Sequence, residues 1–402
     1  MNNKLKLALV TETFSPEVNG VAMTLGKLVD GMLQRGHTVQ VVRPRQNDED
    51  ALLSRDGLQH VLAQGIPIPT YPELRFGLPI KGRLIRLWQA SRPDIVHVAT
   101  EGPLGWSAVA AAKHLGLPVS SSFHTNFHTY SQHYGIGWIK NLIENYLRKF
   151  HNRTLTTMVP TQAMLHALQS RGFNNLSLLS RGVDTRQFSP AKRSHTLRES
   201  WGIGPNDLLC LHVGRLAKEK NIGAVMAAFQ AIQAHQPRAK LVFVGDGPLR
   251  KSLAQTHPDC IFSGTQKGEA LATHYASGDL FLFPSLSETF GNVVPEALAS
   301  GLAVLAFANG AALELIRSEH NGVVLPLADE QDFVTAAVAL ASNPDKLQRL
   351  RQNAAASVVH LGWDAIYDSF AHTLSVLVPQ HGKAPIQTSA TGASLAINQT
   401  SA

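Results

Sequence analysis

The sequence predicts an α/β protein built from two doubly wound domains in tandem. Short apolar runs alternate with helical patterns along most of the chain, which is typical of parallel sheets covered by helices. The alternation restarts near residue 190, and a chain of 402 residues is too long for a single hydrophobic core. We therefore expect an N-terminal domain over residues 1–185 and a C-terminal domain over residues 186–360.

The N-terminal half contains apolar runs that we interpret as strands. Gly36 and Gly116 follow two of the segments between these runs and are typical of helix ends, which predicts helices over 21–34 and 101–114. The predicted strands are 6–11, 38–42, 94–98, 118–123 and 155–159.

The C-terminal half repeats this alternation after a turn-rich linker over residues 181–190. An apolar-faced helix over 361–378 is expected to cross back to the N-terminal domain. The polar and small residues of 379–402 are expected to be disordered. The predicted strands are 208–213, 240–244, 280–283, 303–306 and 323–325.

The composition, with 44% apolar and 16% charged residues, is typical of a soluble globular enzyme. No uninterrupted apolar run reaches the ~18 residues that span a membrane, and the first residues lead directly into a predicted strand. We therefore expect neither a spanning helix nor a signal peptide. Cys210 and Cys260 lie among apolar residues and are expected to be reduced. The predicted location is the cytoplasm, with peripheral binding to the inner face of the cytoplasmic membrane as a further hypothesis.

The net charge of +7 is concentrated in the N-terminal half. Residues 1–190 contain 20 Lys and Arg against 12 Asp and Glu, whereas residues 191–402 contain 16 against 17. Segment 75–92 has five positive charges and no acid, and segment 138–150 places apolar residues beside a basic face. These segments predict either contact with an anionic membrane surface or ordinary core-packed helices with a solvated side.

The loop that follows the strand 280–283 carries two carboxylates, Glu288 and Glu296. It contains a glycine and leads into a helix that we expect to start near Val294 or Pro295. Backbone amides, a helix N-terminus and two carboxylates therefore meet at the end of a strand. Helix N-termini attract phosphate and carboxylates bind sugar hydroxyls, which favours a sugar nucleotide. The alternative is an ordinary strand-loop-helix whose glutamates are solvated.

Two cations follow the strand 208–213, at the end of the sheet where ligands bind in open α/β folds. Arg215 forms planar contacts and Lys220 supplies a compact charge, which together suit a diphosphate, although such residues are often plain surface. Lys218 is expected to point away. Gly245, after the next strand, either lets a ligand approach the backbone or only makes a tight turn. The G-x-G-x-x-G pattern occurs neither here nor after the first strand of the chain, which disfavours a dinucleotide oxidoreductase.

The N-terminal domain also offers polar residues where predicted strands end. Asn19 and Gly20 stand where the chain enters a helix, and the amides from Gly20 onward are expected to face a diphosphate. His124 ends the fourth strand, where it would hydrogen-bond a sugar hydroxyl or a backbone carbonyl. His97 lies within a strand and is expected to belong to the core.

Taken together, these motifs resemble family 4 of the retaining glycosyltransferases, whose GT-B architecture has two Rossmann-like domains facing across a cleft. The resemblance covers residues 4–378. Its most specific part is the E-x7-E element from Glu288 to Glu296, and the order and spacing of the other motifs agree with it. The resemblance implies that a nucleotide sugar binds between the domains, with the nucleotide on the C-terminal domain and the acceptor on the N-terminal one.

The resemblance also implies roles for the candidate site residues. Glu296 would hold the ribose hydroxyls, Glu288 the donor sugar, and His124 would touch that sugar near the reacting carbon. The implied catalytic residues are His124, Glu288, Arg215 and Lys220. The implied substrate-binding residues are Gly20, Asn19, Gly245, Phe290, Gly291, Asn292, Val293 and Glu296. No metal or other cofactor is expected, because two cations and a helix dipole stabilise the charge that grows on the leaving nucleotide.

Segment 11–21 is similar to bacterial members of this family that glycosylate membrane lipids, among them mannosyl- and sulfoquinovosyl-transferases. It implies transfer of a hexose to a lipid or lipid-linked acceptor, with mannose from GDP-mannose favoured and a UDP-linked sugar as the alternative. No nucleic acid partner is expected. A sugar-nucleotide 2-epimerase would instead convert the donor without an acceptor, and a non-catalytic sensor would bind the donor without turnover.

Overall fold

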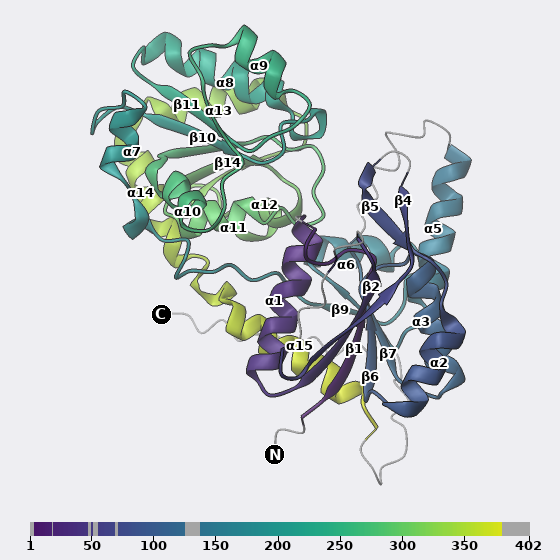
Figure 1. Ribbon diagram of the computed structural model, residues 1–402. Coiled ribbons are helices and arrows are strands. Elements are labelled where there is room, and N and C mark those ends of the chain that lie inside the picture. Colours follow the sequence, from purple (N-terminus) through teal and green to yellow (C-terminus); the bar gives the residue numbers. More distant parts are fainter. Residues whose placement is uncertain are drawn as a thin grey trace, which may run out of the picture.

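Two parallel sheets organise the chain, one in each domain (Figure 1). The computed structural model describes residues 4–17, 19–46, 50, 55–68, 71–124 and 137–379. Within these residues the N-terminal sheet has the strand order β3-β2-β1-β6-β7-β8-β9, and the C-terminal sheet has the order β12-β11-β10-β13-β14-β15. Each order changes direction beside the first strand of its domain, β1 or β10, as in doubly wound folds. The predicted fold class is confirmed.

Helices cover both faces of the N-terminal sheet. Clusters of buried side chains join α1 (Gly20–Gln34) and α15 (Trp363–Leu377) to one face, and α2 (Lys81–Ala90) and α3 (Pro103–His114) to the other (Figure 1). The strands of this sheet are β1 (Lys6–Val10), β2 (Thr38–Pro44), β3 (Leu58–Ala63), β6 (Ile95–Val98), β7 (Val119–Ser122), β8 (Thr156–Val159) and β9 (Leu176–Leu178). The other described elements of this half are the antiparallel pair β4 (Gly65–Ile68) and β5 (Tyr71–Gly77), with α5 (Gly137–His151) and α6 (Gln162–Gln169).

The C-terminal sheet is covered in the same way. The helices α8 (Ile222–His235) and α13 (Glu330–Ala341) pack on one face, and α10 (Gly268–Ser277) and α11 (Val293–Ala299) on the other. Its strands are β10 (Leu209–Val213), β11 (Lys240–Val244), β12 (Ile261–Gly264), β13 (Leu280–Phe283), β14 (Ala303–Phe307) and β15 (Gly322–Leu325). The other described elements are η1 (Pro190–Lys192), α7 (His195–Ser200), η2 (Lys218–Lys220), α9 (Arg250–Thr256), α12 (Gly310–Leu315), α14 (Pro344–Ala356) and η3 (Val359–Leu361).

Every strand predicted from the sequence is present, with ends that differ by at most about two residues. The predictions missed β3, β9 and β12, which all lie at sheet edges, and the pair β4 and β5. Edge strands are covered less completely, and β9 and β12 contain no fully buried residue, so they lack the continuous apolar run of a central strand. Cys210 and Cys260 are buried free thiols, as predicted.

The chain passes between the domains twice, and the two passages run side by side. Val183 and Gly362 pair as a parallel β-bridge between them. Beyond this bridge, α15 packs along α1, where a Cβ atom on Gly31 would lie 2.2 Å from the Tyr367 ring. The helix after the second passage therefore belongs to the N-terminal core. Residues 380–402, most of the predicted disordered tail, lie outside the described residues.

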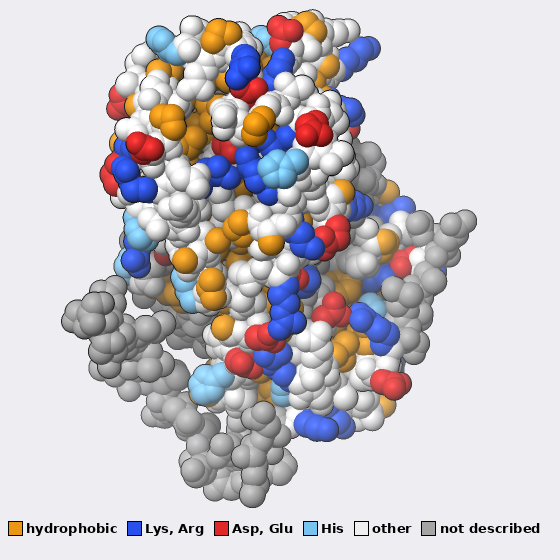
Figure 2. Space-filling model, turned by 90° about the vertical axis from the view of Figure 1, so that its left-hand side faces the viewer, with side chains coloured by type: hydrophobic (Ala, Val, Ile, Leu, Met, Phe, Trp, Pro, Cys, Tyr) orange, Lys and Arg blue, Asp and Glu red, His pale blue; other side chains and the backbone are white. Residues whose placement is uncertain are grey.

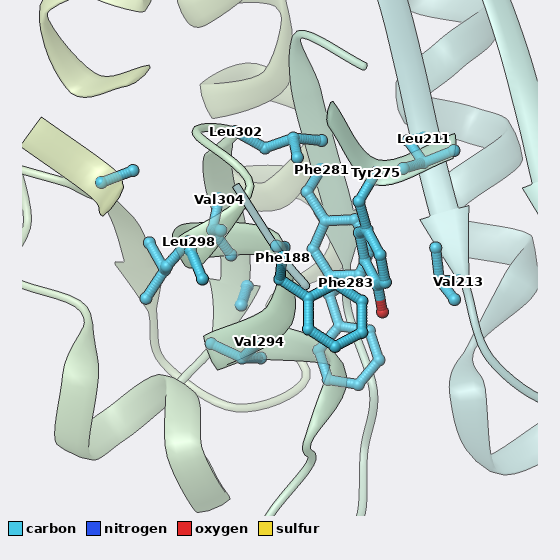
Figure 3. Packing of buried hydrophobic residues seen from close by; sticks show 14 of the residues in the cluster. Phe188, Leu211, Val213, Tyr275, Phe281, Phe283, Val294, Leu298, Leu302 and Val304 are labelled. Atoms are coloured by element: carbon cyan, nitrogen blue, oxygen red, sulfur yellow. The ribbon is translucent and has the colours of Figure 1, made fainter. Parts of the chain in front are cut away.

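Aromatic side chains fill the core below β13 (Figure 3). Phe281 and Phe283 stack on one face of this strand with their ring centroids 5.6 Å apart. Tyr275 lies beside them and meets Phe188 edge-on, also at 5.6 Å between centroids. This packing holds the end of β13 rigidly, and the loop that carries Glu288 begins there.

The surface that carries α1 and α15 mixes basic and acidic side chains (Figure 2). Lys and Arg alternate with Asp and Glu over this face, so the positive excess of the N-terminal half forms no continuous patch there. Among the helices in the described part of the chain, none is both long enough and apolar enough to cross a membrane.

Candidate functional site

Lys220 and Glu288 meet at the carboxyl edge of the C-terminal sheet. β10 and β13 are neighbours in this sheet, so the loops that follow them lie side by side. The ammonium group of Lys220 forms an ion pair with the carboxylate of Glu288, and Ser285 Oγ donates a hydrogen bond to the same carboxylate at 2.7 Å. Only 17% of the Lys220 side chain and 11% of the Glu288 side chain are exposed. The pair therefore fixes both charged groups in one place.

Arg215 occupies the same loop as Lys220 but is open to solvent. Its side chain is 54% exposed, and its contact with Glu219 is loose, with 3.8 Å between Nη1 and Oε1. Lys218 is exposed, as predicted. The loop after β10 thus presents one cation that a carboxylate already holds and one that an incoming anion can reach.

The segment between Glu288 and α11 is shaped by Phe290 and Gly291. The Phe290 side chain is buried, and its carbonyl accepts a hydrogen bond from Ala311 N. Gly291 follows with a φ of +86°, a left-handed conformation that glycine adopts without strain. The helix α11 then begins at Val293, earlier than the predicted start, with Asn292 at its N-cap.

Glu296 is held against the C-terminal core by Tyr275. The Tyr275 hydroxyl donates a hydrogen bond to Glu296 Oε2 at 2.9 Å. Burial raises the pKa of Glu296 to about 7, and the hydrogen bond from Tyr275 lowers it only in part. The carboxyl group therefore titrates close to neutral pH.

Asn19 and Gly20 form the start of α1. Asn19 Oδ1 accepts hydrogen bonds from Val21 N at 3.1 Å and from Ala22 N at 2.9 Å, which makes Asn19 the N-cap of the helix. Gly20 lies opposite the other domain, since a Cβ atom at this position would be 3.8 Å from Asn292 Nδ2. Capping accounts for Asn19 as a structural residue, and substrate binding by it stays a prediction.

Arg181, which belongs to the predicted linker 181–190 and to the motif Arg181-Gly-Val-Asp184 that supports the family resemblance, is a buried cation in the space between the domains. It is 6% exposed, and its Nη2 lies 3.2 Å from His124 Nδ1. Its guanidinium carbon lies 5.8 Å from the centre of the Phe290 ring. Burial lowers the pKa of Arg181 to about 10, and the charge of Glu288 opposes this shift. No role for its side chain was predicted from the sequence.

The two domains contact one another directly at these residues. Thr289 Oγ1 donates a hydrogen bond to the His124 carbonyl at 3.3 Å. Together with the approach of Gly20 to Asn292, this contact brings the strand end of β7 and the start of α1 to the loop that carries Glu288. Predicted residues from both halves of the sequence therefore meet where the two domains face one another.

Two predicted positions have structural explanations. A Cβ atom on Gly245 would lie 2.0 Å from the Gly214 carbonyl oxygen, so glycine is required there for the close packing of two turns. This favours the tight-turn interpretation of Gly245. His97 lies in β6 and hydrogen-bonds Ser120 Oγ and Ser122 Oγ, each at 2.9 Å. Its predicted place in the core is confirmed.

Four buried polar atoms around the cleft have no hydrogen-bond partner among the described residues. They are His124 Nε2, Arg181 Nε, Asn292 Oδ1 and Asn309 Oδ1. Buried polar atoms in proteins are nearly always paired, so each exception calls for an explanation. Each of the four atoms therefore has hydrogen-bonding capacity that none of the described residues uses.

A separate groove with basic walls lies between β3 and α2. Its volume is about 620 Å³, and its lining residues are Arg45, Gln59, His60, Val61, Leu62, Arg83, Arg86 and Leu87. Arg83 Nη1 donates a hydrogen bond to the Leu62 carbonyl at 2.7 Å, which fixes that guanidinium at the wall. Because this lining contains three arginines and no acid, the groove attracts anions.

The second basic segment, 138–150, lies within α5. Leu147 and Phe150 are buried in the domain. Their burial agrees with the alternative that this segment is an ordinary helix packed on the core. Leu142 is 60% exposed and Lys149 is also exposed, so α5 keeps an outer face with an apolar and a basic side chain.

Comparison with protein families gives matches to both halves of the chain. The family described as "Glycosyltransferase Family 4" matches residues 18–187, and "Glycosyl transferases group 1" matches residues 194–357. The boundary between the two matches falls in the region of the predicted linker.

Curated relatives carry names of hexose-transferring enzymes. A GDP-mannose-dependent alpha-mannosyltransferase of Corynebacterium glutamicum is 31% identical over 90% of this chain and 86% of its own length. Sulfoquinovosyl transferase SQD2 of Arabidopsis thaliana is 33% identical over 69% of this chain and 56% of its own length. Alpha-monoglucosyldiacylglycerol synthase of Streptococcus pneumoniae is 26% identical over 85% of this chain and 79% of its own length.

Solved structures share the fold over nearly the whole chain. Sucrose-phosphate synthase of Thermosynechococcus elongatus superposes with a TM-score of 0.77 at 18% sequence identity, over 93% of this chain and 99% of that one. At this identity the likeness establishes the architecture, two facing α/β domains of the GT-B type.

Proposed function

Because the chain belongs to glycosyltransferase family 4, we propose that it transfers a hexose from a nucleotide sugar to a lipid or lipid-linked acceptor. Mannose from GDP-mannose is the first donor to test, since the mannosyltransferase of Corynebacterium glutamicum is similar over most of both chains. A UDP-linked hexose is the alternative, favoured by the likeness to a monoglucosyldiacylglycerol synthase.

The observation that carries the proposal is the joint cleft formed by charged and polar groups of both domains. The C-terminal domain supplies the paired Lys220 and Glu288 with the exposed Arg215. The N-terminal half supplies Arg181 and His124, which reach the same loop. A nucleotide sugar carries an anionic diphosphate and many hydroxyls, and this combination of cations, carboxylates and unpartnered polar atoms suits both.

The chemistry places growing negative charge on the leaving diphosphate. Arg215 and Lys220 stabilise that charge electrostatically, so the proposed reaction needs no metal. Glu288 binds hydroxyls of the hexose, and Glu296 binds those of the ribose. The bond from the anomeric carbon to phosphate breaks, and the new bond to the acceptor oxygen forms on the same face of the sugar. The acceptor proton passes to the leaving phosphate oxygen, and the configuration is retained.

The basic groove and α5 support a lipid acceptor. A phosphorylated headgroup or an anionic bilayer surface would contact the arginines of the groove, and the exposed Leu142 would meet the apolar part of the surface. We therefore propose that the protein acts at the cytoplasmic surface of a membrane while its donor arrives from solution.

A thermal-shift panel of GDP-, UDP- and ADP-sugars tests the proposal. A true donor present at about 100 times its Kd stabilises the folded protein by ~2.7 kcal/mol, whereas the other nucleotides shift the melting temperature little. We expect GDP-mannose to give the largest shift, and that shift to fall in Lys220→Ala but not in Lys218→Ala. No shift with any nucleotide sugar would contradict a donor site in this cleft. Conversion of the donor to an epimer without an acceptor would favour the epimerase instead.

A further inference from the structure

The contact between Arg181 and His124 determines which nitrogen of the histidine carries the proton. Arg181 Nη2 lies 3.2 Å from His124 Nδ1. A guanidinium group has only donors and stays protonated in proteins, so in this hydrogen bond Nδ1 must be the acceptor. A ring whose Nδ1 accepts is neutral and carries its proton on Nε2.

The surroundings of His124 keep the ring neutral. The charged and titratable groups that face it are Arg181 from the interdomain passage, His97 on β6 and His151 on α5. Burial is the main cause that holds the pKa of His124 well below its usual range, and Arg181 adds to it. His97 and His151 are neutral as well, because burial lowers the pKa of each to about 3.

Arg181 is itself fixed by both domains. A Cβ atom on Gly20 would lie 3.7 Å from Arg181 Nη1, and the ring of Phe290 packs below the guanidinium group. These neighbours leave little room for another rotamer, so the direction of the Nη2 donor is set by the cleft itself. The Nε2 atom on the far side of the His124 ring is buried and has no partner among the described residues.

We propose that Arg181 is a positioning residue that holds His124 as the neutral tautomer with its proton on Nε2, so that His124 meets the donor sugar as a hydrogen-bond donor. The ligand atom opposite Nε2 is then an acceptor oxygen of the hexose. The inference rests on the proposed function for the identity of the ligand, whereas the tautomer is a property of the free protein.

The tautomer is measured by nitrogen NMR of histidine-labelled protein without any nucleotide sugar, with His124→Gln used to assign the signal. We expect the Nε2-protonated tautomer at neutral pH, with no titration of His124 where ordinary histidines titrate. In Arg181→Met the ring should stay neutral, because its burial remains, but it should also populate the tautomer with the proton on Nδ1. Arg181→Lys, which also only donates, should behave like the wild type. Arg186→Met, on the same passage but exposed, is the matched control.

Kinetics add a second readout. Removing a partner that orients a functional histidine typically costs about 10- to 100-fold, and we expect this loss in kcat of Arg181→Met with a smaller change in KM. Arg181→Lys should restore most of this kcat, because it keeps a donor toward Nδ1. A wild-type His124 protonated on Nδ1 or on both nitrogens would overturn the inference, as would an Arg181→Met variant that keeps the single Nε2-protonated tautomer and an unchanged kcat. If the tautomer is as stated but no nucleotide sugar binds, the proposed function fails and the role of Arg181 in holding the ring stands.

Discussion

The ammonium group of Lys220 is paired with the carboxylate of Glu288, although the two residues are 68 positions apart in the sequence. The cation expected to hold the diphosphate is thus neutralised by the carboxylate expected to hold the donor sugar. Both side chains are largely buried, so neither charge is screened well by solvent. Binding of a donor therefore replaces one set of ionic contacts by another instead of filling a bare positive site.

Lys220→Ala tests this pair through donor affinity and stability together. The loss of charge-assisted hydrogen bonds should weaken donor binding by about 1.5–3 kcal/mol. The variant should also lose about 1–3 kcal/mol of unfolding free energy, because Glu288 stays partly buried without its partner. Calorimetric titration and denaturant unfolding measure the two effects. Lys218→Ala, exposed in the same short helix, is the control and should change neither. Unchanged donor affinity in Lys220→Ala would remove the diphosphate assignment.

Arg215→Ala should separate binding from stability. The side chain is about half exposed and makes only a loose contact, so its removal should leave the unfolding free energy unchanged within about 0.5 kcal/mol. Donor affinity should still fall by about 1.5–3 kcal/mol if the guanidinium contacts the diphosphate. A variant with wild-type affinity would show that Arg215 is an ordinary surface residue.

Glu296 should make both stability and donor affinity depend on pH near neutrality. Burial raises its pKa from 4.5 to about 7, so folding favours the protonated form. Stability from this group is therefore complete below pH 4.5 and is lost as pH rises through about 7. Donor affinity should change in the opposite direction, because in the proposed site the ionised carboxylate is the form that accepts hydrogen bonds from the ribose hydroxyls.

Burial also raises the pKa of Glu12 to about 7. The variant Glu296→Gln separates the pH dependence that comes from Glu296 from the pH dependence that comes from Glu12. Glu12 accepts a hydrogen bond from Leu104 N at 3.0 Å at the start of α3, so its titration should also change stability. The variant should lose the rise of donor affinity with pH and keep part of the pH dependence of unfolding. If the affinity of the variant still rises with pH as in the wild type, Glu296 is not the titrating group.

Gly31→Ala should destabilise the packing of α15 on α1. A Cβ atom on residue 31 would lie 2.2 Å from the Tyr367 ring. Overpacking of this kind lowers the free energy of unfolding by about 1–3 kcal/mol. Gly26→Ala in the same helix meets nothing within 4 Å and should stabilise by about 0.5–1 kcal/mol through helix propensity. Thermal unfolding of both variants checks the pair. Equal effects would show that α15 does not dock as described.

Membrane contact should depend on the arginines of the groove between β3 and α2. Sedimentation with anionic liposomes should carry the protein down at low salt, and salt should release it, because screening weakens surface electrostatics. The double variant Arg83→Glu and Arg86→Glu should bind less, whereas a charge reversal at Arg186 should have little effect. Absence of binding to anionic vesicles at low salt would exclude this surface as a membrane contact.

Most central strands of both sheets were predictable from sequence because they are buried on both faces and are rich in apolar residues, although β7 reads Val-Ser-Ser-Ser and β8 reads Thr-Thr-Met-Val. The edge strands β3, β9 and β12 were not, since β3 mixes apolar and polar side chains and β9 and β12 contain no fully buried residue, whereas the apolar edge strand β15 was predicted. The hairpin of β4 and β5 stands outside both sheets and lacks the alternation on which the predictions relied.

The site was predictable where a residue follows a central strand. Lys220, Glu288 and His124 each stand just beyond such a strand, and the carboxyl ends of parallel strands share one edge. Arg181 was not predictable, since its importance depends on where the passage between the domains places its side chain. Asn19 and Gly245 were predicted as site residues but have structural explanations. A helix cap and a tight turn use the same residue types as a ligand site, so the sequence does not distinguish them.

Transfer of labelled mannose tests the central claim most directly. The protein is incubated with GDP-mannose labelled in the sugar and with a lipid extract, and the label is followed into the organic phase, with the anomeric configuration of the product read by NMR. We expect label in lipid with the configuration of the donor retained, a strong reduction in Lys220→Ala, and normal transfer in Lys218→Ala. Label that never enters any lipid from a GDP- or UDP-linked hexose, or transfer that is undiminished in Lys220→Ala, would contradict the account.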